Sequence, residues 1–213
     1  MGLPQAQVRF GFPIPSIYSK NRYALAIGNA LLGEYFNSRL NSVIRDELGL
    51  AYGVGSSLSY ARDLSYLSIA SATALPHTPI LIREVQKILE SLKRGEVTSE
   101  EVDTAKSYLI GGYPMSVATL SAVASRWLAG TVYGLGPDFL NEYIPEIEKV
   151  DRARVAASIQ EAFKLSELKI VVAGDASKIG PLLKKFGWKN LQILKPEDLM
   201  ELRESGSLSP RRR

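Results

Sequence analysis

The sequence contains no cysteine and only one histidine, His77, among its 213 residues. Without cysteine the chain has no disulfide, no Cys–zinc site and no thiol nucleophile. A catalytic zinc takes three protein ligands, and one histidine with carboxylates makes only a poor site. We therefore expect no metal or other cofactor in this chain. His77 stands between two residues typical of turns, Pro76 and Thr78, and is interpreted as a surface residue.

Long apolar runs are also missing, and no basic segment followed by an apolar stretch resembles a signal peptide. We expect a soluble protein without a membrane span. The sequence is compatible with either the bacterial cytoplasm or the periplasm. The net charge is +4, and the last three residues, Arg211 to Arg213, supply three of these charges. A nearly neutral body without a basic face predicts no nucleic-acid binding.

Hydrophobic residues make up 46% and charged residues 23% of the chain, as in globular proteins with a sizeable core. Their periodicity predicts strands at the two ends of the chain, a central β-hairpin and several helices. In the first strand Val8, Phe10 and Phe12 alternate with polar or small residues. The expected strands are 5–14, 51–60, 64–73, 168–173 (buried) and 191–194; the expected helices are 23–32, 37–48, 79–92, 98–112, 117–163 with breaks at 134–137 and Pro145, and 177–186.

Adjacent, hairpin-connected strands favour an α+β fold with a largely antiparallel sheet and helices packed on one face. No linker divides the chain, so we predict a single domain over 5–195. Residues 196–213 are expected to form a terminal helix or extension that ends in a loose basic tail. Thr98 and Glu101 have the spacing of a capping box, and Asp175 or Ser177 can cap the last helix.

Gly53-Val54-Gly55 is a poor match to a phosphate-binding loop, because it lacks the third glycine and the following helix of the dinucleotide fingerprint. Glycines and serines alternate along this strand, which we interpret as a face that a helix can approach closely. The turn that contains Gly174 likewise has no lysine or further glycine for an anion and is interpreted as a plain strand-to-helix turn.

Arg45 and Tyr52 lie on either side of a predicted helix-to-strand junction, where their side chains can converge. A guanidinium and a phenol are donors that can hold a peptide carbonyl and stabilise negative charge that develops on its oxygen. The spacing also fits a solvated arginine at a helix C-terminus beside a core tyrosine. Spacing alone leaves both interpretations open.

The runs Phe36-Asn37-Ser38-Arg39-Leu40 and Ile44 to Val54, which reads IRDELGLAYGV, resemble a signature of insulinase-like zinc peptidases. The signature, SRL followed by R-E-x-G-L-A-Y, belongs to the second homologous half of the pitrilysin and mitochondrial processing peptidase type. Further similarity lies in the strand 7–11, the helix 97–111 and the strand 170–175, so that the resemblance extends over about 5–194.

The resemblance implies a C-terminal, zinc-free half that closes a chamber with a homologous zinc-bearing domain or subunit. In the family, the zinc-bearing half carries His-x-x-Glu-His and a distant glutamate. The other half contributes an Arg and a Tyr to a peptide substrate, and these fall on Arg45 and Tyr52 here. Where a zinc-bearing half holds its motif, this chain has the apolar run Ala26 to Leu32, so no zinc ligand is carried over.

The sequence is compatible with two functions. The first is the substrate-binding half of a metallopeptidase, inactive by itself, with zinc in its partner and a weak homodimer as an alternative pairing. The second is a non-enzymatic insulinase-like scaffold or assembly subunit. The presence of both Arg45 and Tyr52 favours the first.

Overall fold

The computed structural model describes residues 4–61, 64–195 and 197–198. Its centre is a four-stranded antiparallel sheet with the strand order β2-β3-β1-β4. The strands are β1 (Gln5–Pro13), β2 (Ala51–Ser59), β3 (Tyr66–Ala74) and β4 (Lys169–Ala173). The predicted α+β class with a largely antiparallel sheet is confirmed, and β2 lies at one edge of this sheet.

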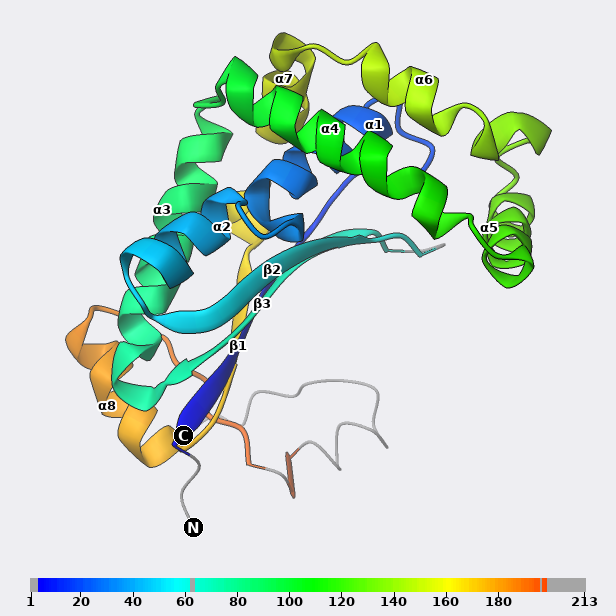
Figure 1. Cartoon of the computed structure of the whole chain (residues 1–213). Coiled ribbons are helices and arrows are strands. Elements are labelled where there is room, and N and C mark those ends of the chain that lie inside the picture. Colours follow the sequence, from blue (N-terminus) through cyan, green and yellow to red (C-terminus); the bar gives the residue numbers. More distant parts are fainter. Residues whose placement is uncertain (1–3, 62–63, 196, 199–213) are drawn as a thin grey trace.

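The helices cover one face of the sheet, as predicted, with α3 and α8 toward one end and α5 at the other (Figure 1). The longer helices are α1 (Arg22–Asn29), α3 (Thr78–Lys93), α4 (Ser99–Ser116), α5 (Leu120–Val132), α6 (Tyr143–Glu148), α7 (Arg152–Ala162) and α8 (Ala176–Lys185). Short 3-10 turns are η3 (Leu75–His77), η4 (Pro137–Leu140) and η5 (Leu165–Glu167). Within the described residues, no helix combines the length and the apolar character needed to cross a membrane.

The core lies between the sheet and these helices. On β1, Val8, Phe10 and Phe12 are buried as predicted, while Gln7 and Arg9 face the open side. Phe12 meets Phe163, which follows α7, edge to face with ring centroids 5.1 Å apart. Each fully buried side chain of this size contributes about 1.5–3 kcal/mol to the burial term.

Two segments near the edge strand are π-helical. Helix α1 continues directly into η1 (Ala30–Glu34), and α2 (Arg39–Asn41) continues into η2 (Ser42–Glu47). The predicted helices at 23–32 and 37–48 are therefore present, but both change their hydrogen-bond pattern in their second half. Such π turns are rare and often occur at functional sites.

Local capping signals in the sequence are confirmed. Thr98 Oγ1 accepts a hydrogen bond from Glu101 N, and the Glu101 carboxylate accepts one from Thr98 N, which closes the capping box. The Asp175 carboxylate accepts a hydrogen bond from Ser177 N at the start of α8. Gly49 has a φ of 59°, a left-handed conformation that ends the helix before β2.

Several expectations are wrong. Residues 191–194 form no strand, and Pro145 lies inside α6 because the first turn of a helix tolerates proline. Strand β4 is not buried: it is the other edge strand, and Val171 is 61% exposed. Of the small residues on this strand, Ser57 is exposed, whereas Gly55 lies close to η1, where an added Cβ would be 3.5 Å from Gly33 O. The predicted extension lies outside the described residues, except for 197 and 198.

Candidate functional site

Tyr52 lies in a bulge of the edge strand β2. Ala51 pairs with Thr73 and Val54 pairs with Ser71, so β2 has one residue more than β3 in this interval. The extra residue breaks the alternation of the strand. Tyr52 is 99% exposed, whereas Val54 is buried. Regular alternation along the strand would place Tyr52 on the same face as Val54; the bulge separates the two side chains, and a core role for this tyrosine is excluded.

Side chains of neighbouring segments hold the bulge in place. The contacts run from Val54 N to Asn41 Oδ1 (3.3 Å), from Thr73 Oγ1 to Leu50 O (2.6 Å) and from Ser71 Oγ to Gly53 O (3.1 Å). Asn41, Ser71 and Thr73 are all buried, and buried hydrogen bonds of this kind are costly to break. The exposed Tyr52 is thus presented by a braced backbone.

Arg45 lies in the last turn of η2, and its guanidinium is fixed from two sides. Nε and Nη2 donate to the two carboxylate oxygens of Asp46 at 2.7 and 2.9 Å, and Nη2 also donates to Phe36 O at 3.3 Å. The Phe36 ring centroid lies 3.5 Å from the guanidinium carbon, a cation–π contact. Among the described residues, no acceptor contacts Nη1.

Charges at the junction are paired. The hydrogen bonds with Asp46 raise the pKa of Arg45. Partial burial acts in the opposite direction, and Tyr52 adds a smaller contribution that also raises this pKa. The same hydrogen bonds lower the pKa of Asp46. Arg45 and Asp46 are therefore both ionised at neutral pH, and Arg45 acts as an oriented donor in a neutral pair. Arg45 lies near the end of η2 and Tyr52 near the start of β2, on the two sides of the same helix-to-strand junction.

Sequence reasoning missed the side chains that position this pair. Phe36 is 72% exposed although it stacks on Arg45, and it stood in the quoted motif without a role. Asp46 stood in the same signature, also without a role. Asn41 carried no signal in the sequence, because its contact with Val54 joins segments 13 residues apart.

Arg39, the arginine of the SRL motif, does not belong to this pair of side chains. It joins neighbouring segments of the fold. Its guanidinium donates to the Glu101 carboxylate (2.8 Å from Nε), to Glu96 O (2.8 Å) and to Ser91 Oγ (3.3 Å). These contacts connect α2 with α3, with the following loop and with α4. A surface cavity of about 750 Å³ lies beside them, with charges of both signs in its wall, and does not include Arg45 or Tyr52.

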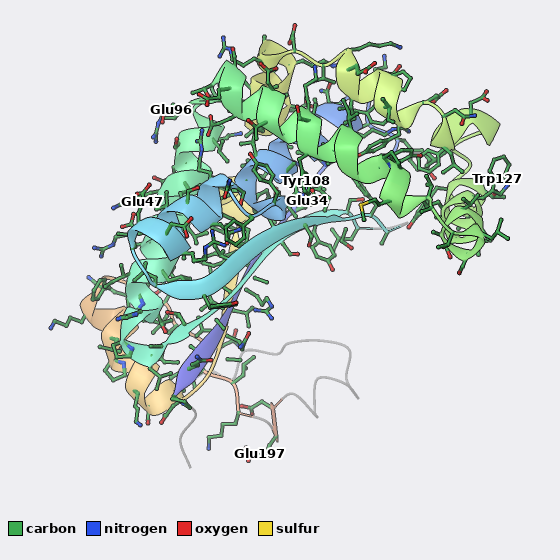
Figure 2. All side chains as sticks on the ribbon, viewed as in Figure 1. Glu34, Glu47, Glu96, Tyr108, Trp127 and Glu197 are labelled. Atoms are coloured by element: carbon green, nitrogen blue, oxygen red, sulfur yellow. The ribbon has the colours of Figure 1, made fainter. Side chains whose placement is uncertain are left out.

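The segment Ala26 to Leu32, where a zinc-bearing half would carry its motif, does not fit a zinc ion. Its side chains are mostly buried and apolar. Asn29 Nδ2 donates to Glu34 at 2.8 Å, Asn29 Oδ1 is buried without a partner, and burial raises the pKa of Glu34. Figure 2 shows Glu34 close to Tyr108 of α4, where no histidine is present. The described residues contain no group of three or more His, Asp or Glu side chains arranged for a metal. His77 is exposed in η3.

Comparison with known proteins identifies the family. The family described as "Peptidase M16 inactive domain" matches residues 1–109, slightly more than half of the chain. The chain belongs to this family. The crystal structure of a peptidase M16 inactive domain from Pseudomonas fluorescens has the same fold, with a TM-score of 0.75 and 23% identity, and the match covers 82% of this chain and 42% of that one.

Curated relatives carry two kinds of name. The protein named "Uncharacterized zinc protease YmxG" of Bacillus subtilis is 29% identical over 159 residues, which cover 75% of this chain and 39% of that protein. "Non-peptidase homolog YmxG" of Helicobacter pylori is 26% identical over 175 residues, which cover 82% of this chain and 40% of that protein. The chain thus spans about two fifths of the length of these relatives.

Proposed function

We propose that this M16 inactive domain is the substrate-binding, zinc-free half of a metallopeptidase and completes a chamber with a homologous zinc-bearing half. Its own contribution is a pair of donors, Arg45 and Tyr52, for a backbone carbonyl of a peptide substrate. In this proposal the zinc ion belongs to the partner, because the described residues of this chain contain no group of side chains that fits one.

The observation that carries the proposal is the exposure of Tyr52. A tyrosine that serves the core is buried, and one in a mobile loop has no fixed direction. Tyr52 is 99% exposed, yet three hydrogen bonds brace the backbone on both sides of it. This arrangement supports a hydroxyl that is kept for a partner outside the chain.

Arg45 supports the same interpretation through its remaining donor. Asp46 and Phe36 occupy Nε, Nη2 and one face of the guanidinium. The N–H groups of Nη1 stay available, in a direction that is already fixed. Donors placed before the reaction stabilise developing negative charge without reorganisation at the moment of reaction. In the proposed reaction Arg45 and Tyr52 hold and polarise the carbonyl, and neither accepts a proton.

A scaffold function is the second candidate, and one contact favours it. Arg45 already has a carboxylate and a carbonyl as partners within the chain, as a purely structural arginine would. A scaffold, however, gives no reason for a fully exposed Tyr52 beside it. The two functions differ in whether a peptide contacts these side chains.

The test is a titration of the isotope-labelled chain with an unstructured peptide of mixed sequence, followed by NMR. We expect saturable shifts of the Arg45 Nε–H signal and of the Tyr52 ring signals, with weak affinity because half of the chamber is absent. Arg83 is a matched control: its guanidinium lies 4.8 Å from the Phe186 ring centroid and donates to Phe186 O at 3.3 Å. Equal responses at Arg45 and Arg83, or none at Arg45 and Tyr52, would contradict the proposal.

A further inference from the structure

Positive charge is concentrated in helix α8 and in the segment that follows it. Between Asp175 and Glu197 the chain has five lysines and no acidic residue, and all five lysines are exposed. They are Lys178, Lys184, Lys185, Lys189 and Lys195. Because the whole chain has a net charge of only +4, the rest of the chain is slightly acidic in sum. The low net charge therefore conceals a basic surface, and such a surface attracts anionic partners.

The outer side of α8 carries three of these lysines. Lys178, Lys184 and Lys185 are exposed, whereas Ile179, on the opposite side of the helix, is buried. Figure 1 shows α8 at the outer edge of the molecule, beside α3. In Figure 2 the next acidic residue along the chain, Glu197, lies well apart from α8. The positive charge is therefore presented outward.

Most of these lysines have no partner that the fold requires. The backbone satisfies the end of α8 by itself, since Trp188 N donates to Leu183 O at 3.1 Å. In the described part of the chain Lys178 pairs with Asp175 at 3.7 Å, and the other four lysines form no ion pair. Their charges are thus available to a partner outside the chain.

Aliphatic side chains are exposed beside these lysines. Ile193 and Leu194 are 58% and 41% exposed. Ile193 lies against α8, because a Cβ added at Gly180 would be 4.0 Å from Ile193 Cδ1. Lys184 follows Gly180 by four residues and therefore lies on the same side of the helix. Aliphatic and cationic groups are thus neighbours on one surface.

A tryptophan lies at the same end of α8. Trp188 is half-buried, and its ring stacks on Phe186 with centroids 6.4 Å apart. The Arg83 guanidinium of α3 lies 4.8 Å from the centroid of the Phe186 ring and donates to Phe186 O, which attaches this turn to the body of the protein. Tryptophan is typical of the level of the headgroups at membrane surfaces.

We propose that this chain binds the surface of anionic lipid bilayers through the α8 surface, which consists of the five lysines with Trp188, Ile193 and Leu194. The lysines are attracted to the anionic headgroups, and the three apolar side chains reach the boundary between the headgroups and the acyl chains. The contact is peripheral and lies in the plane of the membrane. It uses neither Arg45 nor Tyr52, so this inference and the proposed function can fail independently.

The aliphatic side chains favour a lipid surface over other anionic partners. An acidic protein or a nucleic acid would also neutralise the lysines, but neither gives a reason for exposed Ile193 and Leu194 among them. At a bilayer both kinds of side chain are satisfied, because charged and apolar layers lie within a few ångströms of each other.

Co-sedimentation with vesicles tests the proposal. The vesicles consist of phosphatidylcholine alone or with about 30% phosphatidylserine, which gives a negative surface. We expect binding to the anionic vesicles only, and a steep loss of binding as salt screens the charges. A cation near an anionic surface strengthens binding about fivefold. The triple variant Lys184→Gln, Lys185→Gln, Lys189→Gln should therefore lower the partition constant roughly a hundredfold.

A matched variant removes three exposed lysines elsewhere. Lys20→Gln, Lys149→Gln, Lys164→Gln lowers the net charge equally, beside helices α1, α6 and α7, which lie far from α8 in Figure 1. It should lower the partition constant by less than about threefold, because distant charges are screened. Equal losses in the two triple variants, or no binding to anionic vesicles at low salt, overturn the proposal. A chain that ignores vesicles but binds polyglutamate through the same lysines has an acidic protein as its partner, which also overturns it.

Tryptophan fluorescence provides a second readout. The chain has two tryptophans, Trp127 and Trp188, so Trp127→Phe leaves Trp188 as the single probe. On anionic vesicles its emission should shift to the blue, and lipids with brominated acyl chains should quench it. In Trp188→Phe the remaining Trp127, on α5, should show neither effect. Vesicle binding without quenching of Trp188, or with quenching of Trp127 instead, overturns the proposed arrangement.

Discussion

Gly33 of η1 packs directly on the edge strand that carries Tyr52, and we predict that Gly33→Ala is destabilising. A Cβ at this position would lie 2.7 Å from the backbone N of Ser56 and 2.8 Å from Leu40 Cδ1. Because one of these atoms belongs to the backbone of β2, a side-chain rotation cannot relieve the overlap. Overpacking of this kind costs about 3 kcal/mol, and the better helix propensity of alanine returns at most about 1 kcal/mol. We therefore expect a net loss of about 2 kcal/mol.

Thermal unfolding by circular dichroism is the assay. A loss of 2 kcal/mol lowers the Tm of a chain of this size by about 4–8 °C. Gly53→Ala is the control, because no atom beyond its two chain neighbours lies within 4 Å of the Cβ that it would add in the bulge of β2. It should change the free energy of unfolding by less than about 0.5 kcal/mol. A Gly33→Ala variant that melts like the wild type would refute the close packing of η1 on β2.

Three further changes test other parts of the structure. Asn41→Ala removes the acceptor for buried Val54 N and should cost about 1–3 kcal/mol in denaturant titrations; an unchanged midpoint would contradict the braced bulge. Tyr52→Phe should leave the Tm unchanged, because the side chain is exposed; a clear drop would mean that it packs in the core. Partial burial would raise the pKa of Glu101, but hydrogen bonds from Thr98 and Arg39 outweigh it and lower this pKa. Glu101 therefore stabilises the fold above its unfolded pKa, and this contribution disappears as pH falls through the folded pKa. The Tm difference between the wild type and Glu101→Gln should shrink from pH 6 to about pH 3; a difference that grows would contradict the assignment.

Features determined by short sequence segments could be predicted. The capping box of Thr98 and Glu101 and the alternating faces of β1 depend on residues a few positions apart, and both are confirmed. The order of strands and helices gave the α+β class. The M16 resemblance was predictable as well, because its signature lies in one continuous stretch of the chain.

Features that depend on tertiary contacts could not be predicted. The bulge at Tyr52 follows from the pairing of β2 with β3, and a period-two pattern assigns this tyrosine to the wrong face. The π turns form where η1 and η2 pack against β2, a contact that no local propensity encodes. Residues 191–194 have the composition of a strand but no neighbouring strand to pair with in the structure. The orientation of Arg45 depends on Phe36, nine residues away.

Turnover by an assembled enzyme tests the central proposal most directly. The chain would be combined with a His-x-x-Glu-His half from the same source, and hydrolysis of a quenched fluorescent peptide would be measured beside the Tm of each variant. We expect Arg45→Ala and Tyr52→Phe to lower kcat about a hundredfold to a thousandfold, the cost of losing one donor to a developing oxyanion. Their Tm values should stay near that of the wild type. Arg83→Ala, at the matched arginine–phenylalanine pair, should keep full activity. Wild-type turnover in both site variants would contradict the account.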